Sequence, residues 1–176
     1  MISNERKIGL IPRLYVQGKW GPQEFAILVT DQRTILVLEK ESKAGIGGAL
    51  GGAAGALIAG AAQKSRSFDY EQLDPQSLAM DKKNVTVPHD VVQSIQTKKG
   101  FIGPVYRLEY RYQTIEGKSK KVKGQLVPPD AHRKQRKEQG ADRKTIHYDY
   151  AKRAQDVYRS AMSPPRFQSV MIGVLQ

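Results

Sequence analysis

The 176-residue chain contains no cysteine. This absence excludes disulfide bonds, thiolate zinc sites, iron–sulfur clusters and a cysteine nucleophile, and it agrees with a reducing compartment. A chain of this length can bury a core without such covalent or metal cross-links. We therefore expect one compact domain with attached segments.

Catalytic and metal-binding motifs are also scarce. The three histidines, His89, His132 and His147, lie on different expected elements and lack the spacing of a zinc motif. No serine lies in a G-x-S-x-G elbow, and no pair of carboxylates stands out from ordinary surface charge. We expect no enzymatic activity, no cofactor, no metal and no small-molecule substrate.

The N-terminal segment lacks the apolar core of a secretory signal, because Arg6, Lys7 and Arg13 interrupt its apolar residues. We therefore expect a cytoplasmic location. Peripheral attachment at the inner face of the membrane is compatible with this expectation.

Acidic residues are outnumbered by basic ones, and the excess lies in the second half of the chain. The net charge is +12. Residues 1–80 carry 9 lysines and arginines against 8 aspartates and glutamates, whereas residues 81–176 carry 20 against 9. Such an excess attracts polyanions over a long range, which favours an anionic lipid surface or a nucleic acid as partner. A surface that serves solubility alone is the alternative.

One segment, residues 44–62, differs from the otherwise polar and basic chain. Its 19 residues include seven glycines and eight alanines, and none is charged. As a helix it would measure about 28 Å, barely the thickness of the hydrocarbon core of a bilayer. It lacks the Gly-Lys-Ser/Thr end of a phosphate-binding loop and the glycine spacing of a dinucleotide-binding fold.

The spacing of small residues in this segment is that of a helix-packing face. Small residues four apart let helix backbones approach closely, as in a glycine zipper. The glycines that form two adjacent sides are Gly47, Gly48, Gly51, Gly52, Gly55 and Gly60. A helix so rich in glycine needs close packing or a membrane to be stable. We expect shallow membrane insertion or self-association, and a flexible loop is the alternative.

Alternating patterns of apolar and polar residues predict seven strands. In the sixth, three tyrosines and Leu108 point to one side, and Arg107, Glu109 and Arg111 point to the other. Core packing of these tyrosines is favoured over nucleobase stacking. The expected strands cover residues 8–16, 24–30, 33–39, 85–87, 92–97, 105–115 and 118–127.

A helical pattern follows the last strand. The residues Ile146, Tyr150, Ala154, Val157 and Ala161 recur at helical spacing within residues 145–162. This predicts an amphipathic helix that covers a sheet or another helix. We expect a single domain over residues 1–163 with two insertions and a separate tail. These segments are the Gly/Ala-rich insertion 44–66, the basic insertion 129–144 and the apolar tail 164–176, whose packing the pattern leaves open.

Two stretches resemble bacterial and archaeal PH-like (GRAM-like) domains. Residues 27–38, ILVTDQRTILVL, resemble the hairpin between the second and third strands, where an LT-[ND]-x-R-[LI] turn recurs. Residues 81–100, DKKNVTVPHDVVQSIQTKKG, resemble the next recurrent stretch, N-x-x-[IV]-P-x-x-[DE]-[IV]-x-x-[IV], with His89 in the place of an aromatic residue. The resemblance covers residues 7–43, 75–127 and 145–163.

The resemblance implies an α+β, mainly β fold, namely a seven-stranded PH-like barrel or sandwich capped by a C-terminal helix. The small-residue segment would be a helical insertion after the third strand. The resemblance also implies a scaffold that docks on a lipid surface or a protein. Basic residues near the first hairpin hold the inositide in lipid-binding PH domains, but here that hairpin offers only Lys19, beside Trp20. We therefore expect no inositide pocket.

These observations lead to a functional expectation: a non-enzymatic adaptor on an anionic membrane surface or a protein partner. Residues 44–62 would serve shallow insertion or self-association. A nucleic-acid-binding protein that uses the basic half is one alternative, and a zipper-mediated oligomer is another. The expected anionic-surface residues are Lys98, Lys99, Arg107, Arg111, Lys118, Lys120, Lys121 and Lys123.

Overall fold

The computed structural model describes residues 5–18, 21–42, 63–101 and 103–175. The strands are β1 (Lys7–Gly18), β2 (Gly21–Thr30), β3 (Arg33–Ser42), β4 (Gln63–Ser65), β5 (Val85–Pro88), β6 (Val92–Lys99), β7 (Tyr106–Gln113), β8 (Ser119–Leu126) and β9 (Met171–Ile172). The helices are α1 (Pro75–Met80), the 3₁₀ turn η1 (His89–Val91), α2 (Asp130–Glu138), α3 (Arg143–Ala161) and α4 (Pro164–Val170). The fold is α+β and mainly β, as predicted.

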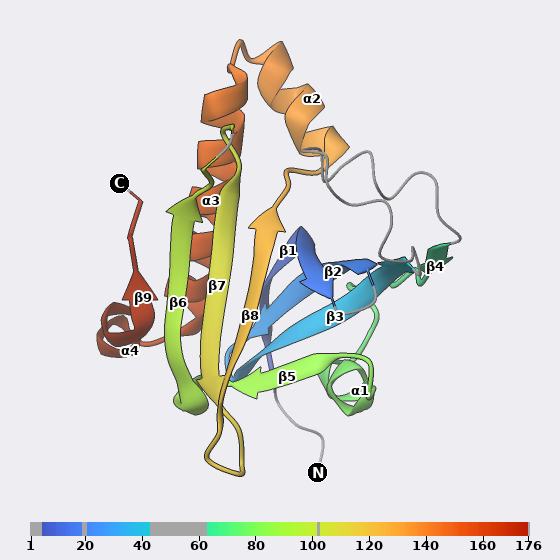
Figure 1. The fold of residues 1–176 in the computed structure, drawn as a ribbon, viewed down its shortest axis with the longest axis vertical. Coiled ribbons are helices and arrows are strands. Elements are labelled where there is room, and N and C mark those ends of the chain that lie inside the picture. The colour runs from blue at the N-terminus through green and yellow to red at the C-terminus, as the bar shows by residue number, and fades with distance from the viewer. Residues whose placement is uncertain (1–4, 19–20, 43–62, 102, 176) are drawn as a thin grey trace.

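All these strands belong to one sheet, which runs in the order β4-β3-β2-β1-β8-β7-β6-β9, and β5 pairs with β3 beside β4. The seven predicted strands are present, and the short strands β4 and β9 are additional. Neighbouring strands are antiparallel except β6 and β9, which are parallel. Figure 1 shows β1, β2 and β3 running at a steep angle to β6, β7 and β8, so the sheet is strongly twisted.

Strand β1 joins the two halves of the sheet. It pairs with β2 along its whole length but with β8 only from Leu14 to Val16. A shift of register separates Ile11 from Leu14, and Arg13 has φ 60° there, so β1 changes direction at a bulge. The close approach of β8 requires glycine at position 124, because a Cβ there would lie 2.7 Å from the Tyr15 carbonyl oxygen.

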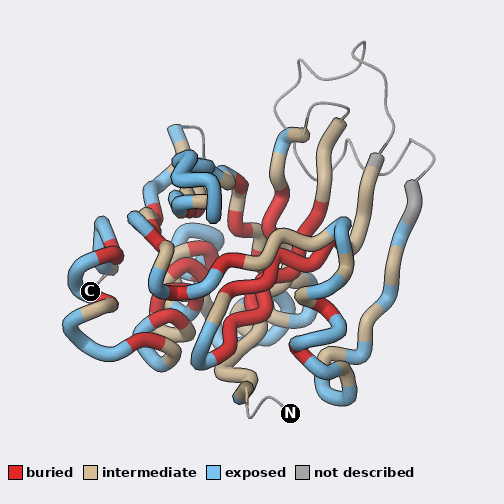
Figure 2. Tube along the Cα trace, turned by 90° about the horizontal axis from the view of Figure 1, so that it is seen from below, coloured by how far each residue is buried: buried red, intermediate tan, exposed pale blue. Residues whose placement is uncertain are grey.

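The main core lies between the twisted sheet and α3. Buried side chains of β2 and β3 meet those of β6, β7 and α3 in one cluster, and Figure 2 shows the buried residues gathered where these elements cross. Ile27, Ile95 and Tyr158 are fully buried there. A smaller cluster packs Leu28, Ile35, Val37 and Leu78 on the other face of β2 and β3, beneath α1.

Helix α3 covers the sheet with the predicted face. Asp142 caps it, because its carboxylate accepts a hydrogen bond of 2.8 Å from the Thr145 backbone N–H. Of the predicted core positions, Ile146, Tyr150 and Ala154 are buried, and Val157 and Ala161 are partly buried against the core. Tyr158, which the sequence pattern did not single out, is also buried.

The segment between the last long strand and α3, predicted as a basic insertion, forms the helix α2. None of its side chains is buried, and its basic residues face solvent. Arg136 of α2 forms an ion pair with Asp149 of α3, which joins the two helices at the surface. Proline at positions 128 and 129 and Gly140, with φ 78°, mark its two ends.

The C-terminal tail, whose packing the sequence left open, folds back onto the domain. Phe167, Val170 and Met171 join the main core, and β9 extends the edge of the sheet beside β6. Arg166 anchors this segment, because its guanidinium donates hydrogen bonds to the carbonyl oxygens of three residues. The acceptors are His89 at 2.7 Å, Asp90 at 3.0 Å and Val92 at 2.6 Å.

The Gly/Ala-rich segment 44–62, with the six glycines of the expected zipper, lies outside the described residues, as do Lys19 and Trp20. Its flanks are described and are paired: Ser42 is the Cα partner of Gln63, and Lys40 is the partner of Ser65. The chain therefore enters and leaves this segment at one point of the sheet edge. The strands before and after the segment belong to one sheet.

The Arg166 contacts generate a stability prediction. Replacement of Arg166 by methionine keeps the aliphatic stem but removes the donors for three backbone carbonyls. We expect a loss of about 1–3 kcal/mol in the free energy of unfolding, measured by chemical denaturation. Arg153→Met on the exposed side of α3 is the control and should change stability by less than about 0.5 kcal/mol. Equal stability of the two variants would show that the tail does not depend on Arg166.

Candidate anionic-surface interface

The register of three strands gathers basic side chains on the outer side of the sheet. Lys98 of β6 is the Cα partner of Arg107 on β7, and Arg111 of β7 is the partner of Lys121 on β8. Partners in a sheet point to the same side. Leu108 and Tyr110 alternate with the arginines and are buried, so the arginines point away from the core. We name as the basic face the outward residues Lys98, Arg107, Arg111, Lys121 and Lys123.

One acidic residue, Glu109, lies inside the basic face as the Cα partner of Lys123. Its carboxylate accepts a hydrogen bond of 2.7 Å from Arg111 Nε. This bond lowers the pKa of Glu109 below its ordinary value, and the charges of Arg111, Lys121 and Lys123 lower it further. Glu109 therefore stays ionised and offsets one charge of the face at neutral pH.

The other three predicted surface residues lie elsewhere. Lys99 and Lys120 are the Cα partners of Tyr106 and Tyr112, so they project to the opposite side of the sheet from the basic face. Lys118 lies in the turn after β7 and forms an exposed ion pair of 2.8 Å with Glu116. The structure thus brings five of the eight predicted residues onto one face.

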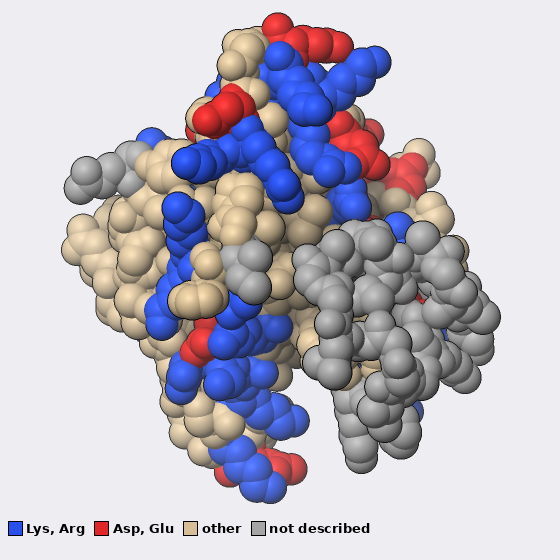
Figure 3. All heavy atoms as spheres, turned by 45° about the horizontal axis from the view of Figure 1, so that its top comes forward, with Lys and Arg blue, Asp and Glu red and all other residues tan. Residues whose placement is uncertain are grey.

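Figure 3 shows lysines and arginines in a column that continues toward a second group at one end of the molecule. The second group belongs to the surface of α2 and the start of α3. Two of its arginines are partly neutralised, since Arg133 pairs with Asp130 and Arg136 pairs with Asp149. The start of α3 contributes Lys144, which is not among the eight predicted anionic-surface residues.

The tyrosines of β7 do not belong to the basic face. Tyr110 is 1% exposed, and its hydroxyl donates a hydrogen bond of 3.1 Å to Thr34 Oγ1. Its ring lies 6.0 Å from the ring of Tyr158 in the core. Core packing of this tyrosine, favoured by the sequence, is what the structure shows. The outward positions of β7 and β8 hold charged and polar side chains, so they offer no aromatic platform for bases.

Two large apolar side chains are exposed at the ends of β7. Phe101, in the loop before β7, is 97% exposed, and Ile115, in the turn after it, is fully exposed. Lys98 and Lys99 precede Phe101, and Lys118 follows Ile115. The basic face is therefore bounded at each end by an apolar tip.

A hollow of about 230 Å³ adjoins the basic face where β8 meets β1. Arg107 and Lys123 line it from one side, and Val16 and Pro22 line it from the other. The close approach at Gly124 forms part of its wall. The basic face is therefore not flat, because this shallow hollow opens at its edge.

The described parts of the chain hold no group of three or more histidine, aspartate or glutamate side chains arranged to bind a metal ion. None of their helices has the length and apolar character needed to cross a bilayer. Comparison with protein-family models, with curated proteins and with solved structures returned no match to this chain.

The Glu109–Arg111 contact generates a prediction for the pKa of Glu109. In Arg111→Gln we expect this pKa to rise toward its ordinary value, because the hydrogen bond and one adjacent positive charge are lost. The change is measured by NMR titration of the Glu109 carboxyl carbon. Arg107→Gln removes a charge of the same face without that bond and should shift the pKa less. An unchanged pKa in Arg111→Gln would rule out the contact in solution.

Proposed function

We propose that the chain is a non-enzymatic adaptor that attaches reversibly to an anionic membrane surface through the basic face. The observation that carries this proposal is the gathering of five cationic side chains from β6, β7 and β8 on one outward side of the sheet. Each basic residue near an anionic leaflet contributes about 1 kcal/mol. The five residues carry five positive charges, of which ionised Glu109 offsets one. Attraction between exposed charges is screened by salt, so we expect high salt to reverse the attachment.

The apolar tips support a membrane over other polyanions. Phe101 and Ile115 are almost fully exposed, and they lie at the two ends of the strand that carries Arg107 and Arg111. When the basic face lies against headgroups, both tips are near the same surface. Large apolar side chains beside lysines are typical of proteins that bind the membrane interface. A nucleic acid offers no equivalent apolar layer for the two tips.

The strand order supports the PH-like interpretation of the fold. Without the two short strands, the order is β5-β3-β2-β1-β8-β7-β6, a meander whose first strand joins both halves. Helix α3 follows the last of these strands and packs on the sheet. We propose a PH-like (GRAM-like) scaffold on this basis.

Nucleic acid is the alternative partner for the same charges. Single-stranded nucleic acid is usually held by stacking of bases on aromatic rings as well as by cations. The tyrosines of β7 point away from the basic face, which favours the lipid surface. A protein partner with an acidic surface would use the face in the same way. Vesicle binding and nucleic-acid binding, measured side by side, distinguish the first two partners.

The main prediction concerns two lysines in the middle of the face. We expect Lys121→Ala/Lys123→Ala to bind vesicles of phosphatidylcholine with 30% phosphatidylglycerol, a test composition, roughly 30-fold more weakly, since two contributions of about 1 kcal/mol are lost. Binding is measured by co-sedimentation at low salt. Lys82→Ala/Lys83→Ala is the matched control, because it removes the same charge from the exposed turn before β5.

Three results would count against the membrane proposal. The first is equal binding by the two double variants, which would show that net charge alone acts. The second is equal recovery in the supernatant with and without phosphatidylglycerol. The third is preferential binding to single-stranded or double-stranded nucleic acid with a steep dependence on salt, which would support the alternative partner.

The small-residue segment 44–62 remains a prediction, with insertion or self-association as its expected role. Because Ser42 and Gln63 are Cα partners, an Asn-Gly turn in place of residues 43–62 would close β3 and β4 as a two-residue hairpin. We expect this variant to keep its fold but to lose part of the vesicle binding or to decrease in mass by light scattering. Unchanged binding and mass would remove both roles from the segment.

A further inference from the structure

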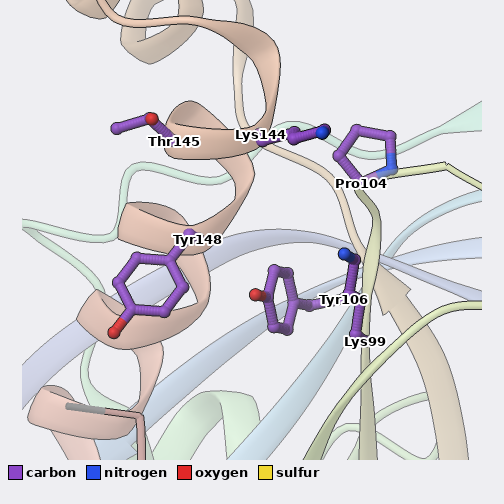
Figure 4. A pocket seen from close by; sticks show the side chains of 6 residues that line it. All are labelled: Lys99, Pro104, Tyr106, Lys144, Thr145 and Tyr148. Carbon is purple, nitrogen blue, oxygen red and sulfur yellow. The ribbon is translucent and has the colours of Figure 1, made fainter.

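A second hollow, of about 270 Å³, lies between the start of α3 and the ends of β6 and β7. It is separate from the basic face, because its residues from the sheet project to the opposite side. Its lining residues are Lys99, Pro104, Tyr106, Lys144, Thr145 and Tyr148. Figure 4 shows their side chains around the opening between the helix and the strand ends.

Two lysines reach this hollow from different elements. Lys99 ends β6 and is the Cα partner of Tyr106 on β7, so their side chains lie next to each other on the helix side of the sheet. Lys144 belongs to the first turn of α3, and Figure 4 shows it extended toward Pro104 above them. Two lysine side chains from different elements thus line one small recess. Two positive charges on one recess favour an anion there.

An aromatic wall completes the recess. The rings of Tyr106 and Tyr148 are 6.2 Å apart and meet edge to face. Thr145 also lines the recess, from the same turn of α3 as Lys144, but Figure 4 shows its hydroxyl directed away from the lysines. At the helix N-terminus, the Asp142 carboxylate already accepts the hydrogen bond of the Thr145 backbone N–H. The recess therefore offers two cations and a flat ring surface.

We propose that this recess binds a phosphate monoester attached to an organic group. A phosphate monoester carries between −1.5 and −2 charges near neutral pH, about the charge that balances two lysines, whereas a diester carries a single charge. The lysines donate charge-assisted hydrogen bonds to the phosphate oxygens. The ring of Tyr106 and the Pro104 side chain lie against the organic part. A volume of about 270 Å³ accommodates the phosphate and one small ring.

The monoester can be free in solution or part of a lipid such as phosphatidic acid. The vesicle experiment rests on the proposed membrane attachment, whereas the experiment with soluble ligands does not. Failure of one proposal can therefore be distinguished from failure of the other. The recess and the basic face are also on opposite sides of β6, since Lys98 and Lys99 are adjacent in sequence and alternate in direction.

The soluble test titrates the full chain with phenyl phosphate, a monoester, and with diphenyl phosphate, a diester, by calorimetry at pH 7.5. We expect the monoester to bind more tightly, and Lys99→Ala/Lys144→Ala to weaken it about tenfold or more. Lys82→Ala/Lys134→Ala removes the same charge outside both the recess and the basic face, and it should leave monoester binding nearly unchanged. Lys99→Arg/Lys144→Arg, which keeps both charges, should retain most of it.

Equal binding of monoester and diester, equal loss in the two alanine variants, or no detectable monoester binding would each overturn the proposal. In the vesicle test, phosphatidic acid is compared with phosphatidylglycerol at equal surface charge. Preference for phosphatidic acid that disappears in Lys99→Ala/Lys144→Ala would place the monoester on a lipid. Monoester binding in solution without that preference would identify a soluble ligand.

Discussion

The antiparallel register of β6, β7 and β8 is the constraint on which both the core and the candidate interface depend. Side chains alternate along β7, so the register that buries Leu108 and Tyr110 also turns Arg107 and Arg111 outward. A slip of one residue would bury the arginines and expose the core. The hydrophobic core therefore fixes the position of the basic face, and no separate interaction is needed to align charges from three strands.

The arrangement of the helices explains why that face stays open. Helix α3 and the C-terminal segment cover the inner side of the sheet, held by the Arg166 hydrogen bonds and by Tyr110 and Tyr158 in the core. Nothing among the described elements packs on the outer side of β6, β7 and β8. Unlike a sheet buried on both sides, this one alternates between apolar and charged residues, which is the pattern of a sheet with one solvent-facing side.

Much of the fold followed from local patterns in the sequence. Strands with alternating residues and the amphipathic helix were predicted because each carries its own periodicity, and the pattern of Arg107, Glu109 and Arg111 identified the outward side of β7. The short strands β4 and β9 have only three and two residues, too few to show an alternating pattern. They are strands because they pair with β3 and β6. The packing of the tail depends likewise on Arg166 and on carbonyl groups about 75 residues earlier in the chain, which no local pattern encodes.

The candidate site was predictable only as a set of charges. A run of basic residues does not say which of them share a side, and the pairing of strands excluded Lys99 and Lys120 from the basic face. The same pairing placed Lys99 beside Tyr106, where Lys144 approaches from a helix 45 residues later in the chain. Such a recess depends on tertiary packing and leaves no motif in the sequence.

The two surfaces suit different parts of recognition. Exposed lysines and arginines on a broad face give attraction that extends over about 8–10 Å at physiological salt but discriminates little between anionic surfaces. A recess with two ammonium groups beside tyrosine rings selects by charge and shape over a few ångströms. Lys98 and Lys99 are adjacent in β6, but Lys98 belongs to the basic face and Lys99 to the recess. The orientation of the domain on a surface therefore decides which way the recess faces. A flat surface that contacts the basic face leaves the recess, on the opposite side of β6, open to solvent.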